Sequence, residues 1–248
     1  PRGRIYLMKQ VFEGAEPTRK TQLHLDRCLT CRNCESTCPS GVEYGHLVDL
    51  GRKVVDAKVP RPLKERALRW VLKEGLTSSL FAPAMKLGQS VRGLLPAALK
   101  AKVPAPQNAG AWPQETHARK VLMLAGCVQP AMMPNINTAT ARVLNACGIQ
   151  VVVPPAAGCC GAVKFHLNDQ VGGLDHMRHN IDAWWPWVEQ GVEAIVMNVS
   201  GCGVTVKEYG HLLQHDVQYA EKAKRISELT RDLSELLPMC LPELQKKL

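Results

Sequence analysis

The stretch Cys28–Pro39, which reads C-L-T-C-R-N-C-E-S-T-C-P, places four cysteines at gaps of two, two and three residues and ends in proline. Short gaps of this kind return each thiolate to the same face of an iron–sulfur cluster, and this spacing is the bacterial ferredoxin pattern. A zinc site usually presents two separated C-x2-C pairs instead. We therefore expect Cys28, Cys31, Cys34 and Cys38 to bind [4Fe–4S] clusters in a helical, ferredoxin-like module.

The same pattern implies that clusters are shared between two motifs. In two-cluster ferredoxins the fourth cysteine of a motif ligates the other cluster. Cys28, Cys31 and Cys34 would then hold one cluster and need a fourth thiolate, and Cys38 would serve a second cluster that is incomplete here. No second motif of this spacing occurs in the 248 residues. We expect it to precede Pro1; otherwise the chain binds a single irregular cluster.

A second group of cysteines follows apolar runs farther along the chain. Cys127 ends one such run, Cys159 and Cys160 precede Gly161, and Cys202 follows a third run. If the runs are parallel strands, their carboxyl ends meet at one edge, where ligands usually bind. The sequence therefore predicts a metal site formed by Cys127, Cys159, Cys160 and Cys202, either a cluster or zinc. Buried, inert cysteines in a glycine-rich turn are the alternative.

Local geometry argues against a disulfide between the adjacent cysteines. Neighbouring Cα atoms lie about 3.8 Å apart, below the disulfide range of roughly 4.4–6.8 Å. Nearby glycines would allow close backbone approach and N–H bonds to sulfur; they are Gly158, Gly161, Gly201 and Gly203. Cys147 and Cys240 stand apart from these groups, and we expect them to be structural thiols.

The pattern of apolar residues divides the chain into segments. Residues 1–57 carry helical patterns around the first cysteine group, and residues 58–118 form a basic helical connector that ends in an Ala/Pro-rich linker. Residues 119–238 alternate short apolar runs (120–124, 151–153, 194–197) with helix-length segments, which indicates a parallel sheet. We expect a helical module followed by an α/β cysteine-rich domain, with residues 239–248 as a tail. The segment from Ile226 to Leu236 has the spacing of one continuous helix.

Charge and composition narrow the function classes. Ten cysteines, most of them clustered, adjacent or at the ends of apolar runs, favour metal ligation in a reducing cytosol over a secreted disulfide framework. The net charge of +9 comes mostly from residues 58–102, which contain ten Lys or Arg and only two Glu. Because the basic residues are confined to this one segment, a nucleic-acid partner is not expected. Leu68, Val71, Leu72, Leu76, Leu80 and Phe81, beside Arg66, Arg69 and Lys73, suit either an anionic membrane surface or a partner subunit.

Histidines and tryptophans near the second cysteine group are assigned structural roles. His166, His176 and His179 follow the Cys-Cys-Gly turn, and His176 and His179 have helical spacing that can hold a metal ion. Lone helical histidines are more often surface or hydrogen-bonded residues, which is our expectation here. Trp184, Trp185 and Trp187 are expected to pack at a helix end or a subunit contact.

Several segments resemble the iron–sulfur subunits of bacterial glycolate oxidase, within the wider group of CCG proteins. They are PRGRIYLMKQ (1–10), LDRCLTCRNCESTCPSGV (25–42), AGCCGAV (157–163), NIDAWWP (180–186) and SGCGVTVKEYG (200–210). Such proteins carry two ferredoxin motifs and two CCG domains, so the resemblance implies that a second CCG domain follows Leu248. Heterodisulfide reductase ends this motif with C-x2-C, whereas Thr205 stands at that position here, so its cluster chemistry is not carried over.

The resemblance implies an electron-transfer subunit of a glycolate dehydrogenase complex, without catalytic residues of its own. A flavin-containing partner would oxidise glycolate to glyoxylate, and the clusters would pass electrons toward the quinone pool. The implied location is the cytoplasm, with peripheral contact to the inner membrane as a further hypothesis. A zinc-stabilised scaffolding module, or a sibling subunit for lactate or anaerobic glycerol-3-phosphate oxidation, stays open as an alternative.

Overall fold

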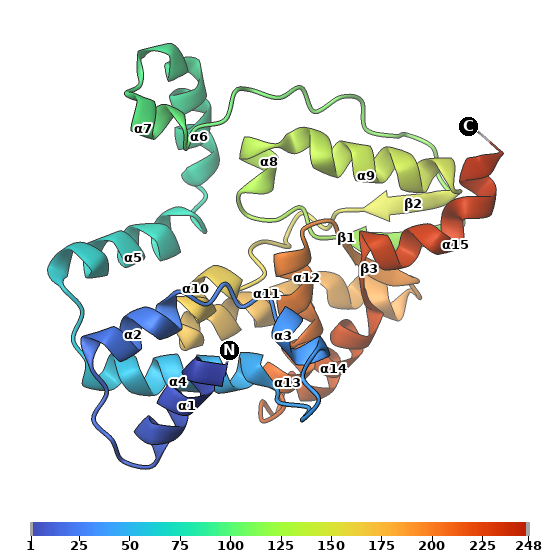
Figure 1. Ribbon diagram of the computed structural model, residues 1–248. Coiled ribbons are helices and arrows are strands. Elements are labelled where there is room, and N and C mark those ends of the chain that lie inside the picture. Colours follow the sequence, from blue (N-terminus) through green and yellow to red (C-terminus); the bar gives the residue numbers. More distant parts are fainter. Residues whose placement is uncertain (1, 247–248) are drawn as a thin grey trace. The chain divides into compact units, whose positions relative to one another are not determined.

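The computed structural model describes residues 2–246, which form two compact units (Figure 1). The first, called here the helical unit, comprises the chain up to Val71 together with His166–Gln170. The second, called the sheet unit, comprises Leu72–Phe165 and the chain from Val171 onward. The expected combination of a helical part with an α/β part that contains a small parallel sheet is confirmed.

The helical unit is built from short helices around one apolar core. They are α1 (Arg2–Phe12), α2 (Arg19–Asp26), α3 (Asn33–Ser36), α4 (Tyr44–Lys58) and the first part of α5 (Leu63–Gly75). Met8, Leu25 and Val48 are buried between α1, α2 and α4. Gly51 of α4 permits this packing, because a Cβ there would lie 2.5 Å from the Met8 sulfur. The helical pattern expected around the first cysteine group is confirmed.

The sheet unit contains four parallel strands in the order β2-β1-β3-β4. Their bounds are β1 Arg119–Met123, β2 Ile149–Val152, β3 Ala194–Met197 and β4 Thr230–Asp232. The register pairs Val121 with Val151 and with Ala194. The chain leaves β1 for β2 on one side and then returns to β3 on the other. This reversal places a topological switch point at the carboxyl ends of β1 and β3.

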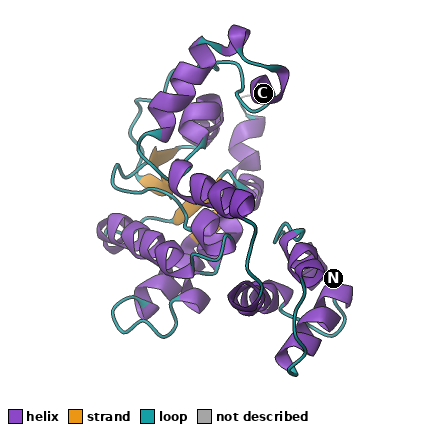
Figure 2. Ribbon diagram, turned by 90° about the vertical axis from the view of Figure 1, so that its left-hand side faces the viewer, coloured by secondary structure: helices purple, strands orange, loops and turns teal. Residues whose placement is uncertain are grey.

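Helices cover both faces of this sheet (Figure 2). Because side chains alternate along a strand, Leu122 and Ile195 face one core while Val121 and Val196 face the other. Residues of α11 (Gln170–Glu189), α12 (Ser200–Lys207) and α14 (Ala220–Leu229) fill the first core, which also includes residues of α10 (Ala162–His166) and α13 (Tyr209–Leu212). The second core uses α9 (Pro134–Ala146) and α15 (Leu233–Gln245), and α8 (Gln129–Met132) precedes α9.

The expected continuous helix from Ile226 to Leu236 is wrong. Strand β4 interrupts it, because Thr230 turns to an extended conformation (φ −73°, ψ 129°) and pairs with Ile195 of β3. Asp232 then caps α15 by accepting the backbone N–H of Ser234, and Glu235 completes a capping box. Burial of Thr230 and this cap outweigh the helical periodicity of the flanking leucines.

The connector is helical, as expected, and is followed by a loop without helix or strand from residue 101 to 118. After α5 come α6 (Phe81–Ser90), the 3-10 turn η1 (Arg92–Leu94) and α7 (Ala97–Lys100). None of these elements contains a buried residue. Across residues 2–246, no helix combines the length and apolar character needed to cross a bilayer.

Candidate metal centre

The second cysteine group follows the carboxyl ends of three adjacent strands. Cys127 comes after β1, Cys159 and Cys160 come after β2, and Cys202 lies in the first turn of α12 after β3. Their side chains interact in the pairs 127–159, 159–160 and 160–202. The structure therefore brings together the four cysteines that the sequence grouped, at the sheet edge where ligands bind in open α/β folds. Their role as ligands stays a prediction.

The environment of this group favours a thiolate at Cys159. Side-chain hydrogen bonds from Cys127 and Cys160 lower the pKa of the Cys159 thiol, and the Gly161 backbone N–H donates to the same sulfur at 3.4 Å. The nearby charge of His176 acts in the same direction. Bonding to Cys159, together with burial, raises the pKa of Cys127 and Cys160. Metal ligation requires thiolates, and the Gly161 N–H that points at the Cys159 sulfur would stabilise one there.

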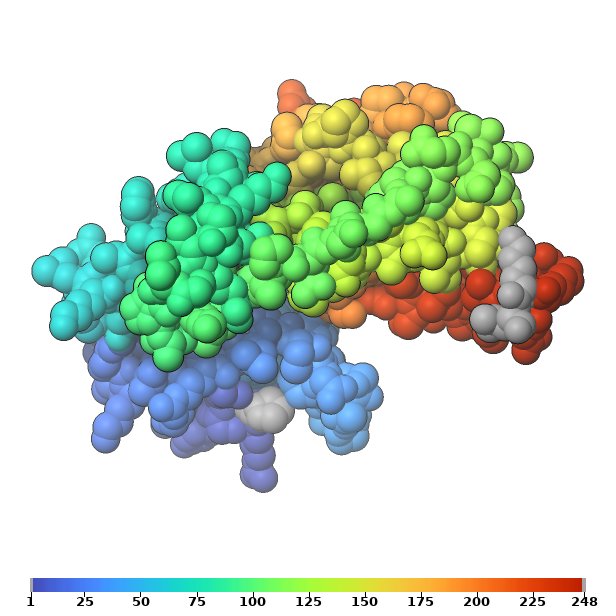
Figure 3. Space-filling view, turned by 90° about the horizontal axis from the view of Figure 1, so that it is seen from above, coloured from blue at the N-terminus to red at the C-terminus, as the bar shows by residue number. Residues whose placement is uncertain are grey.

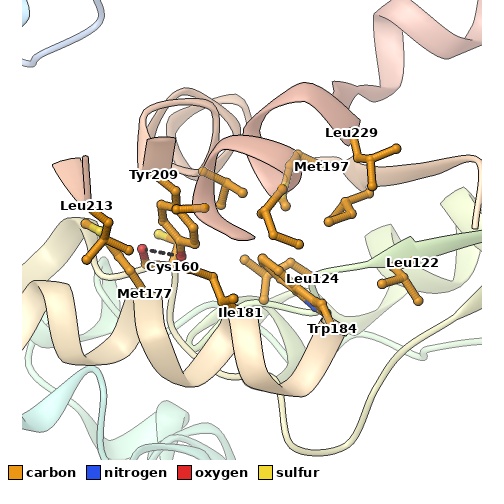
Figure 4. Packing of buried hydrophobic residues seen from close by; sticks show 14 of the residues in the cluster. Leu122, Leu124, Cys160, Met177, Ile181, Trp184, Met197, Tyr209, Leu213 and Leu229 are labelled. Carbon is orange, nitrogen blue, oxygen red and sulfur yellow. Dashed lines mark hydrogen bonds between the residues drawn. The ribbon is translucent and has the colours of Figure 1, made fainter. Parts of the chain in front are cut away.

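Two fully buried polar side chains fix the Cys159–Cys160 turn. Asn180 of α11 accepts the Gly158 backbone N–H at 2.8 Å and donates to the Cys159 carbonyl at 2.8 Å. Tyr209 of α13 donates its hydroxyl to the Cys160 carbonyl at 2.8 Å, drawn as a dashed line in Figure 4. Both side chains are 0% exposed. Hydrogen bonds from two buried side chains therefore fix both carbonyls of the turn. The two sulfurs take no part in these bonds and can interact with the other cysteines.

Gly161 is required at its position by conformation and by space. Its φ of +89° lies in the left-handed region, and an added Cβ would stand 2.6 Å from the Gly173 carbonyl oxygen. Gly158 is different, because a Cβ there meets nothing within 4 Å. Of the glycines expected to allow close backbone approach, Gly161 both permits it and donates an N–H to sulfur.

A network of side-chain amides, in which Gln129 and Asn137 are buried and Asn198 is half-buried, joins the chain around Cys127 to the chain that leads into α12 and Cys202. Gln129 donates to Asn198 at 3.0 Å, and Asn198 donates to Asn137 at 2.9 Å and to Thr140 at 3.0 Å. Asn137 in turn donates to the Ala125 carbonyl at 3.1 Å. Satisfied polar networks of this kind rigidify a core. The network ties the chain after β1 to the chain after β3.

The first cysteine group lies on the segment between α2 and α4 of the helical unit, with Cys34 in the short helix α3. Thr30 and Arg32 adopt left-handed conformations with φ of 55° and 56°, so the chain coils tightly between the cysteines. The buried guanidinium of Arg52 donates to the carbonyls of Leu25 at 3.0 Å and Cys28 at 2.6 Å. These contacts hold the entrance of the loop against α4.

Hydrogen-bond donors surround two sulfurs of this loop. The Thr30 backbone N–H donates to the Cys28 sulfur at 3.4 Å. Backbone N–H groups of Val42, Ser40 and Gly41 donate to Cys38 and lower the pKa of its thiol. The Tyr44 hydroxyl is buried without a hydrogen-bond partner, and burial followed by the adjacent Cys28 sulfur raises the pKa of Tyr44 to about 12. Such donors are those expected around a negatively charged ligand sulfur.

The donor set fits iron–sulfur clusters at both places. All ten cysteines lie within residues 2–246 and none forms a disulfide there, and thiolates are the usual ligands of such clusters. Within residues 2–246 no three His, Cys, Asp or Glu side chains are arranged to hold a metal ion. A cubane takes one thiolate per iron, so its ligands stand farther apart than those of one ion. The backbone donors and the unpartnered Tyr44 hydroxyl support the fit.

The histidines, Trp184 and the two separate cysteines have the following surroundings in the structure. His166 hydrogen-bonds to Asp49 at 3.3 Å, His179 is exposed, and His176 lies half-buried near Cys159. Trp184 is fully buried and stacks on Tyr209 with 6.4 Å between ring centroids. Cys147 and Cys240 are buried in the second core, as expected for structural thiols.

Sequence reasoning missed Asn180 and Tyr209, although a signal for Asn180 existed. The buried face of α11 consists of Gly173, Met177, Asn180, Ile181 and Trp184, at helical spacing. An amide on an otherwise apolar face needs partners, and the Cys159–Cys160 turn supplies them.

Comparison with known proteins agrees with this geometry. Residues 121–207 match the family described as CCG, cysteine-rich domain, and this range contains all four cysteines of the second group. The chain is similar to the glycolate oxidase iron-sulfur subunit of Escherichia coli (strain K12), with 56% identity over 96% of this chain and 59% of that protein. The resemblance inferred from the sequence is therefore confirmed.

Two further relatives are more distant. A probable glycolate oxidase iron-sulfur subunit of Bacillus subtilis (strain 168) is 30% identical over 96% of this chain and 59% of its own length. Lactate utilization protein A of Bacillus cytotoxicus is 25% identical over 48% of this chain and 47% of its own length. The chain thus spans about 59% of the two glycolate oxidase subunits that it matches. No solved structure matches the chain.

Proposed function

We propose that the chain is the electron-transfer part of an iron–sulfur subunit in a glycolate-oxidising complex. The observation that carries this proposal is the group of Cys127, Cys159, Cys160 and Cys202 at one edge of the sheet, in a chain similar to two glycolate oxidase iron-sulfur subunits. These four cysteines would hold a cluster, with zinc as the other candidate. Neither group of cysteines offers a site for the oxidation of glycolate itself.

In this proposal the first cysteine group serves two [4Fe–4S] clusters. Cys28, Cys31 and Cys34 ligate one together with a thiolate from a second motif, and Cys38 ligates the other. Residues 1–57 form this module, residues 58–118 the connector, residues 119–238 the CCG domain and residues 239–248 a tail before a further CCG domain. Backbone donors at Cys28 and Cys38 support ligation by these sulfurs.

The proposed reaction balances across three partners. Glycolate loses two electrons and two protons to a flavin subunit and becomes glyoxylate, and a quinone takes up two electrons and two protons to become a quinol. Iron–sulfur clusters supply the one-electron steps between them. The chain's residues bind the clusters and set the hydrogen bonds to their sulfurs, which tune the potential. A cytoplasmic protein with peripheral contact to the inner membrane fits an acceptor in the quinone pool.

The test uses the full-length protein purified anaerobically with its flavin partner. Glycolate is expected to reduce the clusters, which electron paramagnetic resonance detects, whereas lactate is not. The similarity to lactate utilization protein A favours a second candidate, a subunit for lactate oxidation. Reduction by lactate and not by glycolate would establish that candidate. A protein with no reducible cluster under either substrate would refute both.

A further inference from the structure

Residues 80–102, called here the helical hairpin, lie at the surface (Figure 3) and expose large apolar side chains. It contains α6, η1 and α7, none of which has a buried residue. The most exposed apolar side chains are Leu80 at 71%, Leu87 at 67%, Leu94 at 88% and Leu99 at 55%. Large apolar side chains exposed on successive elements are typical of an interaction surface.

Helices of this length need a surface to pack against. Isolated helices shorter than about 12–15 residues are marginal in water, and most helical stability in proteins comes from packing of an apolar face. The polar contacts of α6 and η1 are sparse: Gln89 donates to the Ala131 carbonyl at 3.2 Å and Arg92 to the Val103 carbonyl at 2.8 Å. One side of α6, with Phe81 and Met85 half-buried, packs against α8, whereas Leu80, Leu87, Leu94 and Leu99 stay exposed among residues 2–246.

The charge of the hairpin has one sign. Between Gly75 and Gln114 the sequence has no Asp or Glu, while it has Lys86, Arg92, Lys100 and Lys102. Lys86, Lys100 and Lys102 are exposed and form no ion pair with any carboxylate of the described chain. Arg69 of α5 differs, because its guanidinium lies 3.8 Å from the carboxylate of Asp26. The sequence suggested that Arg69 could contact a membrane, but this ion pair makes it unavailable.

We propose that the helical hairpin docks on an anionic lipid surface, with its leucines at the headgroup boundary and its lysines against lipid phosphates. Apolar residues beside an excess of Lys and Arg are typical of helices that lie in a membrane interface. Protein interfaces instead are enriched in aromatic residues and depleted in lysine, and the hairpin has one aromatic residue, Phe81, among three lysines. This inference deepens the proposed peripheral membrane contact by assigning its surface.

The test is flotation of the full-length protein with vesicles of phosphatidylglycerol and phosphatidylcholine in equal amounts. Binding is expected at low salt and should weaken at about 1 M salt, where the Debye length falls to about 3 Å. Because a basic side chain near an anionic surface strengthens binding about fivefold, K100Q/K102Q should bind about 25-fold more weakly. L87S/L94S should remove binding. Vesicles of phosphatidylcholine alone should bind little.

Matched controls separate the hairpin from general charge and apolarity. K20Q/K224Q neutralises two exposed lysines elsewhere, and L241S replaces an exposed leucine of α15; both should bind vesicles as the unaltered protein does. No binding to anionic vesicles, or equal binding by the hairpin variants, would overturn the proposal. Loss of the flavin partner with vesicle binding intact would overturn it too, and would assign the surface to a protein. Cluster content measured on the same samples reports separately on the proposed function.

Discussion

Replacement of Asn180 by alanine is expected to destabilise the sheet unit strongly. The side chain is fully buried, and its loss leaves the Cys159 carbonyl without its 2.8 Å donor and the Gly158 N–H without its 2.8 Å acceptor. An unsatisfied buried polar group costs about 1–3 kcal/mol. Because the Gly158 N–H is only partly buried, we expect a total loss of about 2–4 kcal/mol, a large fraction of the 5–15 kcal/mol typical of a domain.

Urea denaturation followed by tryptophan fluorescence measures this loss, since Trp184 stacks on Tyr209 beside Asn180. The matched control is Asn135→Ala in α9, because the Oδ1 atom of Asn135 is buried without a partner and its removal should cost little or nothing. Asn180→Asp keeps the shape and the acceptor but removes the donor to Cys159, so it should also destabilise. A loss below about 1 kcal/mol for Asn180→Ala, or a loss equal to that of Asn135→Ala, would refute the reasoning.

Three further predictions concern single residues. Gly161→Ala should cost at least about 2 kcal/mol in urea denaturation, because the left-handed conformation alone costs about 1–2 kcal/mol and the Cβ would clash with Gly173. Burial opposes ionisation of Asp26, but the Arg61 hydrogen bond and nearby arginines outweigh it and lower its pKa; the stability that this carboxylate adds should be lost in acid circular-dichroism titration as pH falls below about 4. Tyr44→Phe in the full-length, cluster-loaded protein should lower the reduction potential of the cluster that Cys28 serves, measured by redox titration, because the buried Tyr44 hydroxyl beside Cys28 would donate to that sulfur once it ligates a cluster.

Each of these three has its own contrary outcome. Gly158→Ala, where a Cβ has open space, should be tolerated, and equal losses at the two glycines would contradict the steric argument. Asp26→Asn should flatten the acid dependence, and an unchanged titration would assign that dependence to other groups. Tyr6→Phe alters an exposed tyrosine and should leave the potential unchanged; an equal shift in both variants would exclude a specific role for Tyr44.

Much of the sheet was predictable because its strands are short apolar runs separated by helix-length segments. The runs at 120–124, 151–153 and 194–197 correspond to β1, β2 and β3 within one or two residues. Strand β4 was not predictable from this pattern, since Thr230, Arg231 and Asp232 form no apolar run and stand between leucines at helical spacing. Its conformation comes from pairing with β3 and from the cap at Asp232, and both depend on the tertiary structure.

Part of the candidate site was likewise predictable from the sequence, and part was not. Cysteine is distinctive enough, and its spacing specific enough, for both groups to be identified from sequence. Asn180 and Tyr209 are common residue types, and their importance comes from where α11 and α13 place them relative to the Cys159–Cys160 turn. The unpartnered hydroxyl of Tyr44 likewise depends on packing of α4 against the first loop. The sequence offered one signal, the amide of Asn180 on the apolar face of α11, but the surroundings of these three side chains are visible only in the structure.

The most direct test of the account is the metal content of the full-length protein after anaerobic reconstitution. Iron, acid-labile sulfide and zinc are measured in the unaltered protein and in the variant C127S/C159S/C160S/C202S, with circular dichroism to establish that both are folded. We predict iron and sulfide without stoichiometric zinc in the unaltered protein, and a clear loss of iron and sulfide in the variant. Zinc without acid-labile sulfide, or equal iron and sulfide in the two folded proteins, would contradict the assignment of the four cysteines to a cluster.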